Sequence, residues 1–228
     1  MPSPPSARSA TPPTTRAPRP FFIASQLGSS VKRPGPMHLA ASRHLIQYLK
    51  GRADLGLTLG GHGPIQLECW VDASLVEEGS STSQLGYCMR LNGQSGMFCS
   101  RSMRSKLVCF SSTDAELRAL LEAAMEIEWA RVFLGELGYP QRGPTTVHED
   151  NSAVMGIAET LKSTGRTKYL NKVINFVRER VQGKMIRLQK VAGTDNIADI
   201  LSKPLSAPLF LKHRTAMLGL GLAAAPPA

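Results

Sequence analysis

The sequence lacks a long apolar run. No stretch approaches the roughly 18 consecutive apolar residues of a membrane-spanning helix, and the most apolar segment, residues 216–225, is short and rich in Gly and Ala. The first 20 residues have no hydrophobic stretch of the kind found in secretory signals. They contain Arg, Ser and Thr without acids, as transit peptides do, but seven prolines oppose the amphipathic helix of such a peptide. We expect an intracellular protein, in the cytoplasm or nucleus, with no membrane partner.

Acidic residues are absent from both ends of the chain. Residues 1–53 contain eight Lys or Arg and no Asp or Glu, and residues 206–228 add two basic residues without an acid. The 17 acids of the protein all lie in residues 54–205, together with 17 bases, so the formal charge of +10 resides on the flanks. The electrostatic signature of nucleic-acid binding is therefore confined to the flanks.

Paired cysteine motifs are also absent. The four cysteines, Cys69, Cys88, Cys99 and Cys109, form no CxxC pair and have no histidines at zinc-binding spacing. Each lies in an apolar, strand-like stretch. We predict buried, reduced thiols, as is usual for an intracellular protein.

Composition divides the chain into four parts. Residues 1–35 form a Pro-rich, basic segment that we expect to be disordered, although residues 21–35 are ambiguous. Residues 36–60 contain a basic amphipathic helix that ends at Gly51. Such a helix could bind a membrane or a partner, but packing against its own domain is commoner. Residues 64–205 suffice for one domain with a core, and residues 206–228 form an Ala/Leu/Pro tail.

The middle of the chain begins with strands and then alternates strands with helices. The expected strands are 65–72, 85–91 before an Asn-Gly turn, a continuing meander over 96–100 and 106–110, then 145–149 and 185–191. The expected helices are 111–138, 151–161, a helix ending at 182, and a short final helix capped by Thr194 or Asp195. The order βββαβααβα predicts an α/β fold with a mixed five-stranded sheet and helices packed on it.

Four acids stand at the ends of these elements. Asp72 ends the first strand, Glu116 is in the first turn of the long helix, Asp150 follows the fourth strand, and Asp199 is in the last helix. If the first and fourth strands are neighbours, Asp72 and Asp150 lie side by side. Clustered carboxylates need cations, and oxygen ligands suit Mg²⁺ or Mn²⁺. Two such ions roughly 3.5–4 Å apart hydrolyse phosphodiesters.

Each acid also has a purely structural interpretation. Glu116 completes a capping box with Thr113. Asp150 and Asn151 could form only a turn and a helix cap, and Asp199 could be a solvated helix residue. Asp72 is the hardest to explain structurally, because acids are depleted in strands.

Several stretches resemble the ribonuclease H domain of copia-type LTR retrotransposon polyproteins. The matching stretches are WVDAS, SSTDAEL, VHEDNSAV and NIADILSKPL around the four acids, GRTKYLNKVINFVRERV between the last two of these, and HLAASRHLIQYLKG, which resembles the tail of the reverse transcriptase. The resemblance covers about residues 37–205. It implies a ribonuclease H-like fold, cleavage of RNA in RNA–DNA hybrids, and Asp72, Glu116, Asp150 and Asp199 as ligands of two Mg²⁺ or Mn²⁺ ions.

The sequence departs from the family pattern at one conspicuous position. The family usually has His after the Arg-Thr-Lys of this segment, where this chain has Tyr169, and residues 171–175 also differ from the usual pattern. These departures bear on substrate handling or local folding more than on metal binding. Asp114 matches a further acid that is common in the family but is not one of the four.

Recognition of a hybrid requires phosphate contacts and groups that sense the ribose 2′-hydroxyl. The candidate contacts are Ser74, Thr113, Asn151, Ser152, Arg166 and Lys168. The small polar residues among them also suit caps and turns, and the two basic residues also suit a solvated loop.

Three hypotheses remain open. The first is a two-metal-ion ribonuclease H that acts as a fragment of a retrotransposon polyprotein, with a reverse transcriptase domain supplied in trans. This reading assumes a fragment because no polymerase, integrase or protease motif and no zinc knuckle is present. The second is an inactive remnant with at most a nucleic-acid-binding or structural role. The third, a transposase or integrase core, predicts Glu on the last helix and is disfavoured by Asp199.

Overall fold

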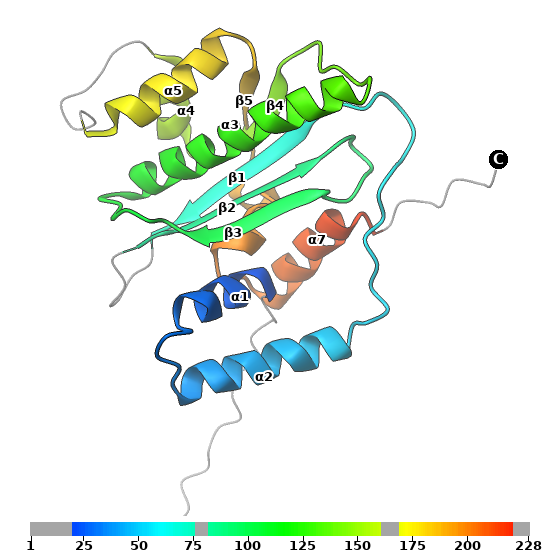
Figure 1. Ribbon diagram of the computed structural model, residues 1–228, viewed down its shortest axis with the longest axis vertical. Coiled ribbons are helices and arrows are strands. Elements are labelled where there is room, and N and C mark those ends of the chain that lie inside the picture. Colours follow the sequence, from blue (N-terminus) through cyan, green and yellow to red (C-terminus); the bar gives the residue numbers. More distant parts are fainter. Residues whose placement is uncertain (1–19, 76–81, 161–168, 221–228) are drawn as a thin grey trace, which may run out of the picture.

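A mixed five-stranded sheet forms the centre of the computed structural model, which describes residues 20–75, 82–160 and 169–220 (Figure 1). The strands are β1 (Glu68–Ser74), β2 (Gln84–Arg90), β3 (Cys99–Arg104), β4 (Thr145–Glu149) and β5 (Ile186–Lys190), in the order β3-β2-β1-β4-β5. The first three strands pair antiparallel, whereas β1–β4 and β4–β5 are parallel. The expected fold class is confirmed.

Helices cover both faces of the sheet, as Figure 1 shows. One layer contains α3 (Ser112–Glu136), α4 (Ser152–Glu159) and α5 (Asn171–Gln182). The other layer contains α6 (Asp199–Ser202), α7 (Ala207–Leu218) and α1 (Pro20–Ser29), and α2 (Pro36–Lys50) lies outside this layer, farther from the sheet. None of the described helices is both long and apolar enough to cross a membrane.

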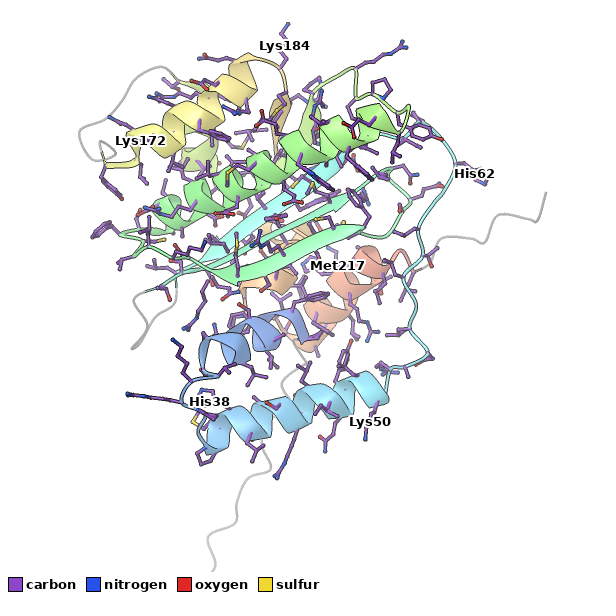
Figure 2. The ribbon with its side chains drawn as sticks, in the orientation of Figure 1. His38, Lys50, His62, Lys172, Lys184 and Met217 are labelled. Atoms are coloured by element: carbon purple, nitrogen blue, oxygen red, sulfur yellow. The ribbon has the colours of Figure 1, made fainter. Side chains whose placement is uncertain are left out.

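Strand β1 is buried on both faces because it lies in the middle of the sheet. Cys69 and Val71 belong to the core cluster that includes residues of α3, whereas Trp70 belongs to a second cluster with Phe210 and Met217 of α7. Figure 2 labels Met217 on that helix. The run of three apolar residues at positions 69–71 is typical of such a strand. The strand continues to Ser74, so Asp72 lies within it and not at its end as predicted.

The structure differs from the sequence-based expectations at both flanks. Helix α1 forms almost wholly within residues 21–35, the part of the N-terminal segment that the sequence left ambiguous, and α7 forms within the expected tail. Residues 106–110 form no strand, because the Ser105 hydroxyl donates to the carbonyl oxygen of Leu107 (2.7 Å) and turns the chain. All four cysteines are free, as predicted; three are buried and Cys99 is partly buried.

Candidate metal centre

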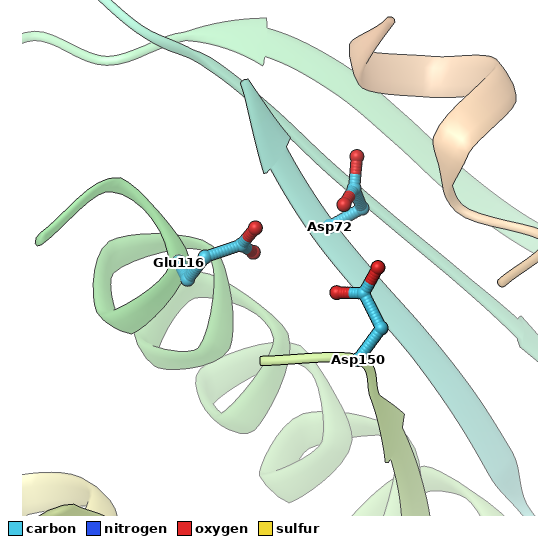
Figure 3. A group of neighbouring side chains, drawn as sticks. All are labelled: Asp72, Glu116 and Asp150. Carbon is cyan, nitrogen blue, oxygen red and sulfur yellow. The ribbon is translucent and has the colours of Figure 1, made fainter. Parts of the chain in front are cut away.

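Three carboxylates from three different elements meet at one edge of the sheet. Asp72 lies on β1, Asp150 follows β4, and Glu116 projects from the first turns of α3 (Figure 3). Oxygen atoms of these side chains all lie within 4.8 Å of one another. Asp72 and Asp150 come together because β1 and β4 are parallel neighbours, which was the condition set in the sequence analysis.

Glu116 has no capping role in the structure. The N-cap of α3 is Ser111, whose hydroxyl accepts a hydrogen bond from the Asp114 backbone N–H (3.1 Å), so the predicted capping box with Thr113 is wrong. The Glu116 side chain is only 5% exposed, and its Oε2 has no hydrogen-bond partner among the described residues. A buried carboxylate oxygen without a donor is costly unless a cation compensates it.

The electrostatics of the cluster favour an added positive charge. Burial raises the pKa of Glu116 to about 10, and the nearby carboxylates of Asp72, Glu149 and Asp150 add to the effect. Burial and then Asp199 raise the pKa of Asp72 to about 7, with Lys203 opposing them. These carboxyl groups resist ionising together, which is the usual behaviour of like charges in one site.

Glu149 is a further acid of the site that the sequence analysis missed. It is fully buried at the end of β4; its Oε1 accepts from the Asn151 backbone N–H (2.9 Å), and its Oε2 has no partner among the described residues. Burial raises its pKa to about 8, against the backbone hydrogen bond from Asn151. The acid pair Glu149–Asp150 at a strand end was the available signal.

Asp199 lies outside the group of three but next to it. It is the first residue of α6, after Ala198, so neither Thr194 nor Asp195 caps this helix as predicted; both belong to the short 3-10 helix Gly193–Asp195. The Lys203 ammonium joins Asp199 to the cluster, with Nζ 3.1 Å from Asp199 Oδ1 and 2.8 Å from Asp72 Oδ1. The Ser202 hydroxyl also donates to Asp72.

Close packing against the sheet fixes the position of α6. A Cβ on Gly86, the residue paired with Asp72 on β2, would lie 2.7 Å from Leu201 Cβ, so only glycine permits this approach. The Asn196 side-chain amide donates to the Val71 carbonyl oxygen (2.8 Å), and Ser74 donates to the Ser202 carbonyl oxygen (2.6 Å). The segment that contains Asp199 and Lys203 is therefore tied to β1.

Two of the predicted nucleic-acid contacts have structural roles. The Ser74 hydroxyl is used in the bond to Ser202, and the Asn151 side chain caps α4 by accepting from the backbone N–H groups of Ala153 (3.0 Å) and Val154 (3.3 Å). Ser152 is exposed at the start of α4, and Thr113 is partly buried at the start of α3. Arg166 and Lys168 lie outside the described residues.

Tyr169, which stands where the similar family usually has His, lies beside α3. Its hydroxyl donates to Asp114 Oδ2 (3.3 Å), and its ring packs edge-on against Phe110 with centroids 5.3 Å apart. Asp114 is fully buried and is also bound by Arg118, so it supports the start of α3 and is not part of the carboxylate cluster.

The donor set fits a divalent cation. All the converging atoms are carboxylate oxygens, which hard divalent ions prefer, and the unpartnered oxygen of Glu116 is buried among them. The cluster can therefore hold a divalent ion.

Comparisons with known proteins point to one group of relatives. The chain is 29% identical over 174 residues to the retrovirus-related Pol polyprotein from transposon TNT 1-94 of Nicotiana tabacum, covering 76% of this chain. It is 27% identical over 190 residues to the corresponding polyprotein from transposon RE1 of Arabidopsis thaliana, covering 83% of this chain. The chain spans about 13% of the length of each of these relatives. No protein-family model matches the chain.

Solved structures similar to this chain include two ribonucleases. RNase H1 from the halophilic archaeon Halobacterium salinarum has a TM-score of 0.45 and 16% identity, covering 60% of this chain and 94% of that one. LC11-RNase H1 in complex with an RNA/DNA hybrid has a TM-score of 0.44 and 12% identity, covering 60% of this chain and 94% of that one. The sequence relatives by themselves confirm the resemblance to copia-type retrotransposon polyproteins.

Proposed function

We propose that this chain is the ribonuclease H part of a retrotransposon polyprotein, and that it cleaves the RNA strand of RNA–DNA hybrids with two Mg²⁺ or Mn²⁺ ions. The buried carboxylate cluster of Asp72, Glu116 and Asp150 carries the proposal, together with the unpartnered oxygen of Glu116. The polyprotein relatives support it. Such a protein would work in the cytoplasm or nucleus, with a reverse transcriptase domain as its partner.

Divalent ions bound at this site would activate a water molecule and stabilise the leaving oxygen of a phosphodiester. The residues of the chain supply the position and the charge. Asp72, Glu116 and Asp150 would hold the metal, and Asp199 lies beside them at the start of α6. The exposed hydroxyl of Ser152 and the partly buried one of Thr113 stand at the helix starts near the cluster, where a phosphate or a 2′-hydroxyl could reach them.

The test is hydrolysis of a labelled RNA–DNA hybrid with Mg²⁺ and then with Mn²⁺. We expect cleavage of the RNA strand and its loss, by roughly 100-fold or more, in Asp150→Asn, because a ligand of the cation is removed. Glu159→Gln is the matched control, since it neutralises an exposed acid on α4 and should cleave as the parent protein does.

The second candidate function is an inactive nucleic-acid-binding remnant. The ammonium of Lys203 favours it, because it stands between two of the four acids. Folded, monodisperse protein that binds the hybrid but cleaves it with neither metal would support the remnant and overturn the nuclease.

A further inference from the structure

The carboxylates of the site fall into two unlike halves. On the side of Glu116 and Asp150, no Lys or Arg of the described residues forms an ion pair with either carboxylate, and the Oε2 of Glu116 is buried without a partner. The Lys190 ammonium donates to the backbone carbonyl oxygen of Asp150 and not to its carboxylate. On the side of Asp72 and Asp199, the Lys203 ammonium contacts both carboxylates, at 2.8 and 3.1 Å. The structure thus contains one pair of carboxyl groups that no ammonium contacts directly and one pair that the Lys203 ammonium bridges.

The fold determines where Lys203 lies. It directly follows α6, one helical turn after Asp199, so both residues project from the same short segment. That segment is bound to β1 through Asn196 and Ser74 and is pressed against Gly86. The ammonium therefore has a fixed position relative to Asp72.

An ordinary surface ion pair does not describe this arrangement. Exposed pairs contribute little, because water screens both charges. Here Asp72 is fully buried, Asp199 is 6% exposed, and only the Lys203 side chain, at 33%, retains partial contact with water. Loss of the lysine would leave two buried carboxylates side by side, which calls for another cation.

We propose that Lys203 is a built-in counter-ion that regulates metal loading at this site. Without substrate, the protein takes one divalent ion at Asp72, Glu116 and Asp150, and a second ion can bind between Asp72 and Asp199 only by displacing the ammonium. Lys203 is thus a positioning residue that makes complete loading depend on a further negative charge, such as a phosphate of the nucleic acid. This inference rests on the proposed function, since it concerns the same site.

Calorimetric titration of the whole chain with Mg²⁺ alone, in the absence of nucleic acid, tests the proposal. We expect one ion per chain in the parent protein. In Lys203→Met we expect two ions, or on the order of 10-fold tighter binding, because a positive charge next to the site no longer repels the metal. Lys203→Arg should behave as the parent does. Lys212→Met is the matched control, because it removes the same charge from an exposed pair with Asp195.

Unchanged stoichiometry and affinity in Lys203→Met would overturn the proposal. A thermal melt distinguishes a change in metal binding from a folding defect. Lys203→Met should melt at a lower temperature than the parent without metal, and added Mg²⁺ should restore its melting temperature. A variant that stays unfolded in saturating Mg²⁺ would also overturn it, because the ammonium would then be irreplaceable in the fold.

The titration contains no hybrid, so it separates this inference from the nuclease function. Parent protein that binds Mg²⁺ as expected but cleaves no hybrid would refute the nuclease and leave the counter-ion intact. Parent protein that cleaves the hybrid, together with a Lys203→Met variant that titrates like the parent, would refute only the counter-ion.

Discussion

Two buried acids on α3, only two residues apart, have opposite surroundings. Asp114 accepts from Arg118 Nε (2.6 Å), the Phe110 backbone N–H (3.0 Å) and the Tyr169 hydroxyl (3.3 Å). Glu116 faces other carboxylates, and its Oε2 has no partner among the described residues. The same chemical group therefore stabilises the fold at one position and opposes it at the other.

This contrast predicts opposite stability effects in metal-free protein. Burial and neighbouring carboxylates raise the pKa of Glu116 from 4.5 to about 10. The folded protein therefore keeps this proton while the unfolded chain releases it, and metal-free protein loses stability as pH rises from about 4.5 towards 10. At pH 8, Glu116→Gln should raise the free energy of unfolding by about 1–3 kcal/mol. Asp114→Asn should lower it by about 2–3 kcal/mol, because it breaks a buried ion pair.

Urea unfolding of both variants in a chelating buffer measures the effect. Added Mg²⁺ should stabilise the parent protein more than Glu116→Gln. If Glu116→Gln were less stable than the parent at pH 8 without metal, the interpretation of Glu116 as a carboxyl group that opposes the metal-free fold would be wrong.

The sequence could predict the three clustered acids, but not Glu149 or the other surroundings of the site. The proximity of Asp72 and Asp150 follows once the first and fourth strands are neighbours, because parallel strands bring their carboxyl ends to the same side of the sheet. Lys203 could not be placed in this way, since it is 131 residues from Asp72 and only the tertiary fold brings the two together. Glu116 also satisfied a local capping pattern, which the true cap at Ser111 replaces.

At the scale of elements, α7 is the largest departure from the sequence-based expectation. The segment was expected to be a tail, but Phe210, His213 and Met217 are buried, and the helix ends at Gly219 in the left-handed conformation (φ 65°). Apolar residues lie on several sides of α7, so it lacks the single-face periodicity that predicts a surface helix. Its order comes from packing against Trp70 and the other residues of the core on that face.

Because His213 of α7 is buried, we predict that the protein loses stability in mild acid. Burial, together with Lys212, lowers the pKa of His213 from 6.5 to about 4, with Asp195 opposing them, and its Nε2 has no partner among the described residues. The unfolded chain takes up this proton below about pH 6.5 and the folded one only near pH 4. The stability contribution is therefore complete above pH 6.5 and falls by up to about 3 kcal/mol towards pH 4.

Unfolding free energies measured from pH 7 to pH 4 check this assignment. The parent protein should lose more stability over this range than His213→Leu. His44→Leu, which alters an exposed histidine of α2, should follow the parent curve. Parallel curves for the parent and His213→Leu would contradict the assignment.

At the scale of the whole molecule, the N-terminal helices belong to the fold. Gln84 of β2 donates to the Ser25 hydroxyl (2.8 Å), and Arg104 of β3 donates to the Gln26 side chain (2.9 Å), so α1 is bound to the sheet. Tyr48 of α2 packs edge-on against Phe210 of α7 with ring centroids 6.0 Å apart. An apolar cavity of about 510 Å³ lies among α1, α2 and α7.

Deletion of residues 1–60 should therefore destabilise the protein. The deletion removes the cover over Phe210 and leaves the Gln84 amide without Ser25, so we expect a melting temperature lower by about 5–10 °C and reduced solubility. Thermal melts and size-exclusion chromatography measure both effects. Val31→Ser, a change at a 73% exposed position between α1 and α2, is the control. An unchanged melting temperature after the deletion would show that these helices contribute nothing to the domain.

Ser202 and Lys203 contact Asp72 from the far end of the chain, and this has a consequence for synthesis of the protein. Synthesis proceeds from the N-terminus, so all five strands and the three converging acids exist before Lys203 and Ser202 are added. The bond from Ser202 to Asp72 joins residues 130 positions apart, and contacts of such long sequence separation slow folding. A growing chain that ends at residue 190 thus has its acids but not yet its own counter-ion. During that interval, bound protons or a divalent ion from the surroundings would have to neutralise them.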